Sequence, residues 1–274
     1  MKRIRKTIML MLGILIAGAL TSNAQNFQGI ATYQSSRKIG NISTKGVHMS
    51  PEDEKQIMRG LKKQSQKEYE LKFNLTESIW AEAESLAAAQ VNSPSAGAVV
   101  SSNSSYPEPI IYKNMADNLY LYETESWDKL FLVESQLKNR EWKLTNETKR
   151  IGNYNAQKAT LIEIVHRNVI SFDNDDSKEK ISTDTVKIEA WYTPEIPVSN
   201  GPDKFWGLPG LIMEVSDGKT TFLCTKVILN PKGGVTIKKP FRGEKVSPEE
   251  FKKISGEKTK EMMKKFNHKK IGGN

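Results

Sequence analysis

Residues 184–227 read DTVKIEAWYTPEIPVSNGPDKFWGLPGLIMEVSDGKTTFLCTKV, and this stretch decides the fold. At its start every second residue is apolar, namely Val186, Ile188 and Ala190. Residues 212–225 continue the alternation on both sides of Asp217-Gly218. A period of two predicts β-strands. The Asp-Gly pair predicts a tight two-residue hairpin, because these residues tolerate the positive φ angles that such a turn needs.

The segment between these strands is rich in proline. Within Tyr192–Pro209 there are four prolines, at positions 194, 197, 202 and 209. Each lacks an N–H donor, so the segment can form neither a central strand nor a helix. We expect a rigid, extended loop that crosses from one strand to the next.

Further runs with strand character follow one another closely along the chain. We expect strands at residues 27–36, 69–75, 110–114, 118–125, 130–134, 141–144, 152–164 and 168–172. A short polar turn would join the strands at 130–134 and 141–144, and a charged turn would cover 173–180. Such spacing predicts a mainly antiparallel sheet. The expected fold class is therefore mainly β (α+β), a curved antiparallel sheet or half-barrel with an early helix and a basic C-terminal helix.

Two segments carry the signals of a helix start. Ser50-Pro51-Glu52-Asp53 places a capping residue and two acids before an early helix that we expect to end at Gln66. Ser247-Pro248-Glu249-Glu250 is a capping box with proline at the first helical position. Residues 85–105, by contrast, consist mainly of Ala, Ser, Asn and Pro without a period, which predicts a flexible insertion.

The first 24 residues have the order of a secretory leader. A basic start is followed by the apolar run Ile8–Leu20 and by the small-x-small signal Ser22-Asn23-Ala24. The apolar run is shorter than the roughly 20 residues that span a bilayer, and no cysteine near the cleavage point could carry a lipid. We expect an exported, periplasmic, non-lipidated protein, with an uncleaved membrane anchor as the alternative.

The net charge of +9 is concentrated near the C-terminus and in the leader. Residues 238–270 hold twelve Lys or Arg against five Glu, which leaves residues 25–237 slightly acidic. A lysine-rich helix in this part of the chain can lie on an anionic membrane surface or on another protein, or it can be a solvated face docked by its few apolar residues. An exported chain with no aromatic interleaving in its basic run is not expected to bind nucleic acid.

The single cysteine, Cys224, excludes an internal disulfide, so packing alone must hold the fold. Because Cys224 falls on an expected strand, a small buried apolar residue is a better interpretation than a nucleophile.

Several motifs resemble those of one known family. Similarity to the GLPGLI signature is carried by Ala190-Trp191-Tyr192-Thr193, Ile196-Pro197, Gly201-Pro202 and, above all, Trp206-Gly207-Leu208-Pro209-Gly210-Leu211-Ile212. Residues 142–149, with Ile151, Tyr154, Lys158 and Ala159, resemble the family's middle region, where a cysteine often stands in place of Asn155. The resemblance covers most of residues 27–245. It implies a small exported protein of Gram-negative bacteria, often found near outer-membrane uptake receptors, and it defines no catalytic residue.

The central motif has two interpretations. Gly207 and Gly210 permit backbone angles closed to other residues, and Pro209 fixes the turn between them. In the first interpretation the loop is a lid that closes one end of the core. In the second it rims a groove for an apolar or extended ligand, because rigid aromatic side chains on a loop lose little entropy on binding. The candidate ligand-binding residues are Trp191, Tyr192, Phe205, Trp206, Leu208 and Leu211.

Catalytic signatures are sparse. The histidines at 48, 166 and 268 are dispersed without metal-ligand spacing, and no nucleophile motif is visible. We therefore expect no metal and no cofactor. Four carboxylates near the central loop could provide an acid–base pair or bind a hard cation, although solvated turn positions are the simpler assignment. They are Glu195, Asp203, Glu214 and Asp217.

These observations divide the chain into a leader (1–24), a β domain (25–245) and a basic helical tail (246–274). The expected function is that of a non-catalytic periplasmic binding or accessory protein that holds an apolar ligand or an outer-membrane uptake partner. A carboxylate-dependent hydrolase and a purely structural envelope component are the alternatives. A cavity beneath Trp206 would favour ligand carriage, converging carboxylates an enzyme, and a filled interior a structural role.

Overall fold

The computed structural model describes residues 27–38, 52, 59, 65–83, 108–173 and 176–271. The leader, the insertion 85–105 and most of the early helix lie outside these residues; of the early helix only Glu52 and Arg59 are described, and both are helical. Within the described residues, no helix combines the length and the hydrophobicity that crossing a bilayer requires. The elements are β1 (Gln28–Arg37), β2 (Glu68–Asn74), β3 (Glu77–Glu82), β4 (Ile110–Asn114), β5 (Leu119–Ser126), β6 (Lys129–Gln136), β7 (Lys143–Ile151), β8 (Tyr154–Asp173), β9 (Asp176–Thr193), β10 (Leu211–Ser216), β11 (Thr220–Leu229), β12 (Glu244–Val246) and α3 (Pro248–Ile271).

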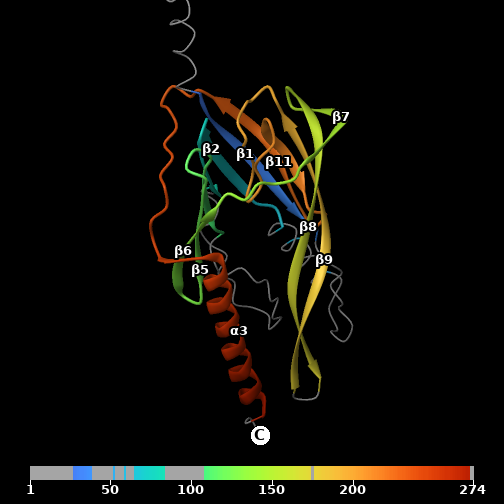
Figure 1. Cartoon of the computed structure of the whole chain (residues 1–274), viewed down its shortest axis with the longest axis vertical. Helices are drawn as coiled ribbons and strands as arrows, with labels where there is room; N and C mark the ends of the chain where they lie inside the picture. The colour runs from blue at the N-terminus through green and yellow to red at the C-terminus, as the bar shows by residue number, and fades with distance from the viewer. Residues whose placement is uncertain are drawn as a thin grey trace, which may run out of the picture.

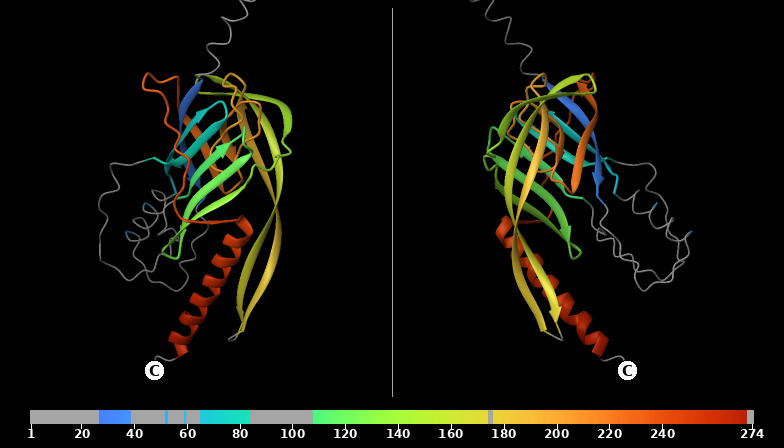
Figure 2. Two further views of the ribbon diagram at one scale, coloured as in Figure 1. Left: turned by 60° about the vertical axis from the view of Figure 1, so that its left-hand side comes forward. Right: turned by 90° about the vertical axis from the view of Figure 1, so that its right-hand side faces the viewer.

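The twelve described strands form one open, curved sheet in the order β12-β6-β5-β4-β3-β2-β1-β11-β10-β9-β8-β7. Neighbouring strands are antiparallel, except that β12 runs parallel to β6. α3 and the far half of the β8–β9 hairpin project from the same end of the sheet (Figures 1 and 2). The prediction of a mainly β fold with a curved antiparallel sheet and a C-terminal helix is confirmed.

The β2–β3 hairpin contains a strand that the sequence pattern does not predict. β2 buries Tyr69, Leu71 and Phe73, as its alternation requires. Asn74 then closes the turn, because its Oδ1 accepts hydrogen bonds from the N–H groups of Thr76 and Glu77. β3 follows at once and buries Trp80. Its charged ends and its two adjacent large apolar residues, Ile79 and Trp80, leave only a weak period-two signal.

The β10–β11 hairpin forms as predicted, but its turn differs. Three residues connect the strands, and within this turn only Gly218 has a positive φ, 84°. Asp217 contributes its side chain instead. Its Oδ1 accepts hydrogen bonds from the N–H groups of Lys219 and Thr220 at 2.9 and 2.7 Å. The carboxylate therefore closes a longer turn than the Asp-Gly pair suggests.

The β8–β9 hairpin is longer than predicted. β8 is continuous where two strands are expected, and β9 begins at Asp176, inside the expected charged turn 173–180. The backbone register runs without interruption from Gln157↔Tyr192 to Asp173↔Asp176. The prediction of a long charged turn is wrong because two paired strands satisfy each other's backbone groups whatever the polarity of their side chains.

The predicted hairpin between residues 130–134 and 141–144 is also wrong. β6 and β7 lie near opposite ends of the sheet, and residues 137–142, the crossing segment, run over the open side between them (Figure 1). Trp142 explains the path. Its ring packs against a core cluster on the far side, and its Nε1–H donates to the carbonyl oxygen of Trp206 at 2.8 Å.

α3 begins at the predicted capping box. The N–H of Ser247 donates to Glu250 Oε2 at 2.8 Å, and the N–H of Glu250 donates to Ser247 Oγ at 3.2 Å. Phe251 and Ile254 pack against the buried side chains of Phe131, Val133 and Val246. The first two turns of α3 are thus anchored on β6 by a few apolar contacts, and the rest of the helix projects from the sheet (Figure 2).

Candidate functional site

The Pro-rich loop, residues 194–210, packs on the concave face of the sheet. It contains neither a named strand nor a helix, as predicted, but it is folded rather than extended. The N–H of Leu211 donates to the carbonyl oxygen of Ile196, and that of Ile212 donates to the carbonyl oxygen of Asn200. From the sheet, the Ser78 hydroxyl donates to Asn200 Oδ1 at 2.8 Å. The loop therefore belongs to the core.

Lys113 of β4 binds this loop to the sheet through hydrogen bonds. Its side chain is fully buried, and Nζ donates to the carbonyl oxygens of Gly201, Asp203 and Phe205 at 2.8, 2.9 and 3.2 Å. Three acceptors match the three donors of an ammonium group. Burial lowers the pKa of Lys113 to about 7, while the neighbouring Asp203 carboxyl opposes this shift. We refer to this arrangement as the Lys113 anchor.

Gly210 permits the close approach between the loop and β9. A Cβ at this position would lie 2.1 Å from the carbonyl oxygen of Thr193, so no other residue fits without moving the backbone. Gly207 has a φ of 94°, a conformation that favours glycine for a different reason. The two glycines of the motif therefore serve packing and turn geometry respectively.

The six predicted ligand-binding residues do not form one site. Four of them are buried in hydrophobic clusters, namely Tyr192, Phe205, Leu208 and Leu211. Trp191 is half-buried and faces the other side of β9 from Tyr192, where Lys149 Nζ lies 4.3 Å from its ring centroid. Trp206 alone lines an open groove. The assignment of all six as ligand contacts stays a prediction.

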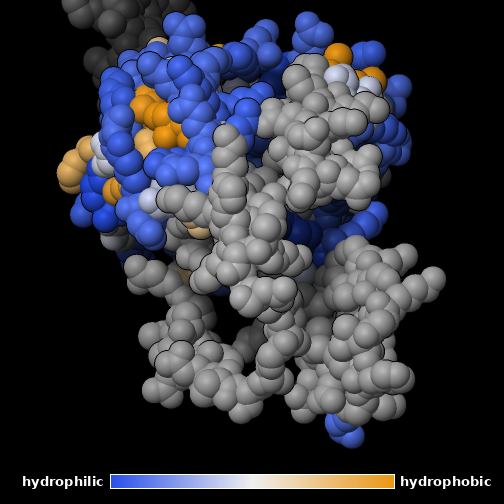
Figure 3. Space-filling view, turned by 90° about the horizontal axis from the view of Figure 1, so that it is seen from below, coloured by the Kyte–Doolittle hydropathy of each residue, from blue (hydrophilic) through white to orange (hydrophobic). Residues whose placement is uncertain are grey.

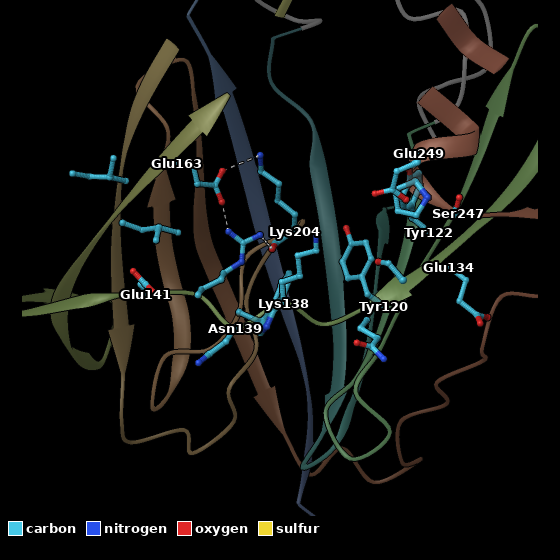
Figure 4. A pocket seen from close by; sticks show the side chains of 17 residues that line it. Tyr120, Tyr122, Glu134, Lys138, Asn139, Glu141, Glu163, Lys204, Ser247 and Glu249 are labelled. Carbon is cyan, nitrogen blue, oxygen red and sulfur yellow. Dashed lines mark hydrogen bonds and ion pairs between the residues drawn. The ribbon is translucent and has the colours of Figure 1, made fainter. Parts of the chain in front are cut away.

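That groove has a volume of about 810 Å³ and lies between the β5–β6 side of the sheet and β8 (Figure 4). It is lined by Tyr120, Tyr122, residues 134–136, 138–141 and 161–163, Lys204, Trp206 and residues 247–249. The crossing segment, the Pro-rich loop and the start of α3 thus all contribute to its walls. Seen from the end to which α3 points, the described surface is mostly hydrophilic with small hydrophobic areas (Figure 3).

An aromatic row runs along the groove. It consists of Trp206, Tyr120, Tyr122 and Phe251, whose successive ring centroids are 5.6, 6.1 and 6.1 Å apart. The first three line the groove. Successive rings meet at 34°, 62° and 86°, so the row does not form one flat face.

Arg140 connects the crossing segment to both the loop and β8. It forms an ion pair with Glu163, donates from Nη2 to the carbonyl oxygen of Lys204 at 2.8 Å, and packs 4.3 Å from the ring centroid of Trp206. Glu163 also lies 3.6 Å from Lys204 Nζ. Two cations therefore share one carboxylate, and this cluster carries a net positive charge.

Several polar groups in the groove are unpaired within the described part of the chain. The hydroxyls of Tyr120 and Tyr122 have no hydrogen-bond partner there, and neither do the side chains of Gln136, Lys138 and Asn139. Burial raises the pKa of Tyr122, and the Glu249 carboxyl raises it further. The groove thus combines aromatic side chains with polar groups that are unpaired within the described chain.

The four carboxylates proposed for acid–base chemistry are not brought together. Glu195 accepts a hydrogen bond from the N–H of Asn155, Glu214 pairs with Lys149 at 2.7 Å, and Asp217 closes its hairpin turn. Asp203 is half-buried beside the Lys113 anchor, and desolvation raises its pKa. Among the described residues, no group of three or more His, Cys, Asp or Glu side chains is placed to hold a metal ion.

Cys224 is buried and without a disulfide in the described chain, and burial raises its pKa to about 12. The thiol is therefore protonated at neutral pH, as expected for a small packing residue.

Sequence reasoning missed Tyr120, Tyr122 and Arg140. The tyrosines have a weak sequence signal. Leu119 and Leu121 lie on one face of β5 and the two tyrosines on the other, and a strand with large side chains on both faces is expected to have contacts on both. Arg140 has no such signal, because its role depends on a crossing segment that links opposite ends of the sheet.

Residues 142–214 match the model of a family described as a protein of unknown function, Porph_ging. This segment extends from the crossing segment to β10 and contains the whole Pro-rich loop. No curated protein matches the sequence. Among solved structures, PNGF-II in space groups C2 and P21 is similar, with TM-scores of 0.47 and 0.46 and 16% identity over 84% of this chain. The match covers only 32% and 33% of the PNGF-II chains, so this chain spans about a third of their length.

Proposed function

We propose that this chain is a non-catalytic binding or accessory protein of the cell envelope, and that it holds an extended ligand or partner segment in the groove. One observation carries this proposal. The groove of about 810 Å³ has an aromatic floor and unpaired polar side chains, whereas the interior beneath Trp206 is filled by the loop's own side chains. Among the described residues, the groove is where free volume and aromatic side chains meet, so it supports this proposal better than carriage of an apolar ligand deep inside the sheet.

The place in the cell and the family are part of the same proposal. The leader pattern of residues 1–24 supports export to the periplasm without a lipid. The GLPGLI-like residues 206–212 lie inside the segment 142–214 that matches an uncharacterised family. We infer on this basis that the chain is a GLPGLI-type envelope protein.

Native mass spectrometry tests the proposal. Protein purified from its own envelope is compared with the same protein after unfolding and refolding. We expect a stoichiometric adduct that is lost on refolding and absent from Asn139→Trp, because the large side chain would fill the groove. Lys187→Trp, at an exposed position of β9 outside the groove, is the control and should keep the adduct. An adduct that survives in Asn139→Trp, or a clean apo mass in every sample, would contradict binding in the groove.

A further inference from the structure

We infer that the groove recognises an extended polypeptide segment that carries a basic side chain on one edge and an acidic side chain on the other. This inference rests on the proposed function and specifies the chemistry of the ligand. Three features of the groove carry it, namely the orientation of the rings, the separation of charge and the unpaired polar groups.

The orientation of the rings favours separate side chains over a flat ligand. Successive members of the aromatic row are tilted by 34°, 62° and 86° to each other. Trp206 is only 9% exposed and already packs against Tyr120 and Arg140. A glycan stacks on one continuous flat aromatic surface, whereas successive rings of this row are not coplanar. The ring centroids of Tyr120, Tyr122 and Phe251 instead follow one another at 6.1 Å, which is close to the roughly 6.6–6.8 Å repeat of same-side residues in an extended peptide, so successive side chains of such a peptide can each pack against one ring.

Charge is separated across the groove. On one side Glu134 and Glu249 lie near the start of α3, and on the other Lys204 lies with Glu163 on the β8 side, with Tyr120 between them (Figure 4). The Arg140–Glu163–Lys204 cluster is net positive. Glu249 has no ion-pair partner in the described chain, and Glu134 has only Lys245, an exposed side chain 2.8 Å away. A neutral glycan would leave both charges unused, whereas a peptide can match both.

The unpaired groups also suit a peptide. Gln136 and Asn139 each offer an amide donor and acceptor, and the hydroxyls of Tyr120 and Tyr122 offer both as well. A peptide backbone presents one N–H and one C=O at each residue, so it can satisfy these groups in pairs. The same strand-like backbone would direct alternate side chains toward the aromatic row.

A phage-displayed random heptapeptide library, panned on the folded full-length protein, provides the probe. We expect enriched peptides with apolar residues at alternate positions and at least one Lys or Arg. Panning on Asn139→Trp should enrich nothing above background, and panning on Lys187→Trp should reproduce the wild-type result. Enrichment that is unchanged in Asn139→Trp would overturn recognition in the groove.

Reversing charges on the peptide and on the protein then tests whether the acidic side of the groove binds a basic side chain. An enriched peptide is synthesised with its basic residue intact and with that residue replaced by glutamate, and both are measured by fluorescence anisotropy. Glu249→Lys should weaken the basic peptide roughly tenfold and strengthen the glutamate peptide, because opposite charges across an interface attract and like charges repel. Lys187→Glu, which reverses a charge outside the groove, should change neither affinity by more than about twofold.

The outcomes distinguish the ligand class from the proposed function. If wild-type panning enriches no basic peptides while the native adduct of the envelope protein is still lost in Asn139→Trp, the groove binds but the peptide assignment is wrong. An adduct whose fragments differ by hexose masses would likewise overturn the peptide assignment and identify a glycan. If neither the native adduct nor the peptide enrichment changes in Asn139→Trp, the proposed function itself is overturned.

Discussion

The concave face of this sheet is filled in one region and open in another. Over β1 to β4 and β10, the Pro-rich loop occupies the face and buries side chains such as Ile196 and Leu208 completely. Between β5–β6 and β8, the crossing segment, the start of α3 and two residues of the loop, Lys204 and Trp206, line a groove that remains open. Both regions are lined by aromatic and charged side chains.

The two regions differ in how most of their polar groups are satisfied, although Asn200 Nδ2 in the filled region is buried without a hydrogen-bond partner among the described residues. In the filled region the one buried lysine has three carbonyl partners, all supplied by the loop. In the groove, the hydroxyls of Tyr120 and Tyr122 have no partner within the described chain. A protein leaves buried polar groups paired and keeps unpaired ones where another molecule or water can reach them. The filled region therefore stabilises the fold, and the groove is free to bind.

The largest effect is expected where the loop meets β9. In Gly210→Ala the new Cβ would overlap the carbonyl group of Thr193, which is backbone and cannot rotate away. We expect a loss of about 4 kcal/mol in the free energy of unfolding, as for severe overpacking, measured by urea denaturation. Gly233→Ala, where no atom lies within 4 Å of the added carbon, is the control. Similar losses for both variants would mean that the loop is not tightly packed.

A smaller loss is expected from the Lys113 anchor. Lys113→Met keeps the length of the side chain but leaves the carbonyl oxygens of residues 201, 203 and 205 without their donor. We expect a loss of about 3 kcal/mol, with Lys187→Met, at an exposed position, close to wild type. An unaffected midpoint in Lys113→Met would show that the loop holds its place without the anchor.

The same lysine predicts a dependence on pH. The folded chain loses the Lys113 proton near pH 7, whereas the unfolded chain holds it up to the ordinary pKa of 10.5. Between these values the unfolded state binds more protons, so stability rises with pH. From pH 7 to pH 9.5 we expect the free energy of unfolding to increase by about 3 kcal/mol, and Lys113→Met to lose this increase. A wild-type profile that is flat or falls over this interval would refute the assignment.

The smallest effect is expected in the groove. Asn139→Trp and Tyr122→Phe remove no hydrogen bond within the described chain, so each should change the free energy of unfolding by less than about 0.5 kcal/mol. Thermal denaturation of both variants and of Lys113→Met would show directly whether the groove substitutions destabilise the chain less than the loss of the Lys113 anchor. If either groove variant destabilised the chain as strongly as Lys113→Met, the division into a stabilising and a binding region would fail.

Much of the fold is predictable because it depends on local patterns. The alternation in β2, the hairpin after Ser216 and the capping box at Ser247 each involve residues close in sequence. The prediction for 173–180 is wrong although the partner is close in sequence, because residues 176–180 pair with 169–173 of β8 while their charged sequence has no period of two. The prediction for the 130–144 hairpin is wrong because it depends on a distant partner, since Trp142 carries the crossing segment to the far side of the sheet. Such contacts leave no periodic signal in the chain.

The candidate site is less predictable than the fold. Aromatic and glycine residues identify the Pro-rich loop as important, but their arrangement cannot show that Leu208 and Leu211 point into the core while Trp206 reaches the groove. That depends on how the loop folds back on itself, through bonds such as Leu211 N–H to the carbonyl oxygen of Ile196. The Lys113 anchor is likewise hidden in the sequence, because a lysine on a strand usually lies at the surface.

The central pairing of β1 with β11 has a consequence for how the chain folds. The two strands come from opposite ends of the described sequence, and the bond between Gln28 and Asn230 joins residues 202 positions apart. A chain that emerges from the ribosome N-terminus first must keep β1 unpaired on one edge until β11 has been made. Contacts of this range fold slowly, and an open strand edge is a template for association with other chains. The period of greatest risk for aggregation therefore lasts until residues 220–229 arrive, and we expect holding chaperones to matter most during that time.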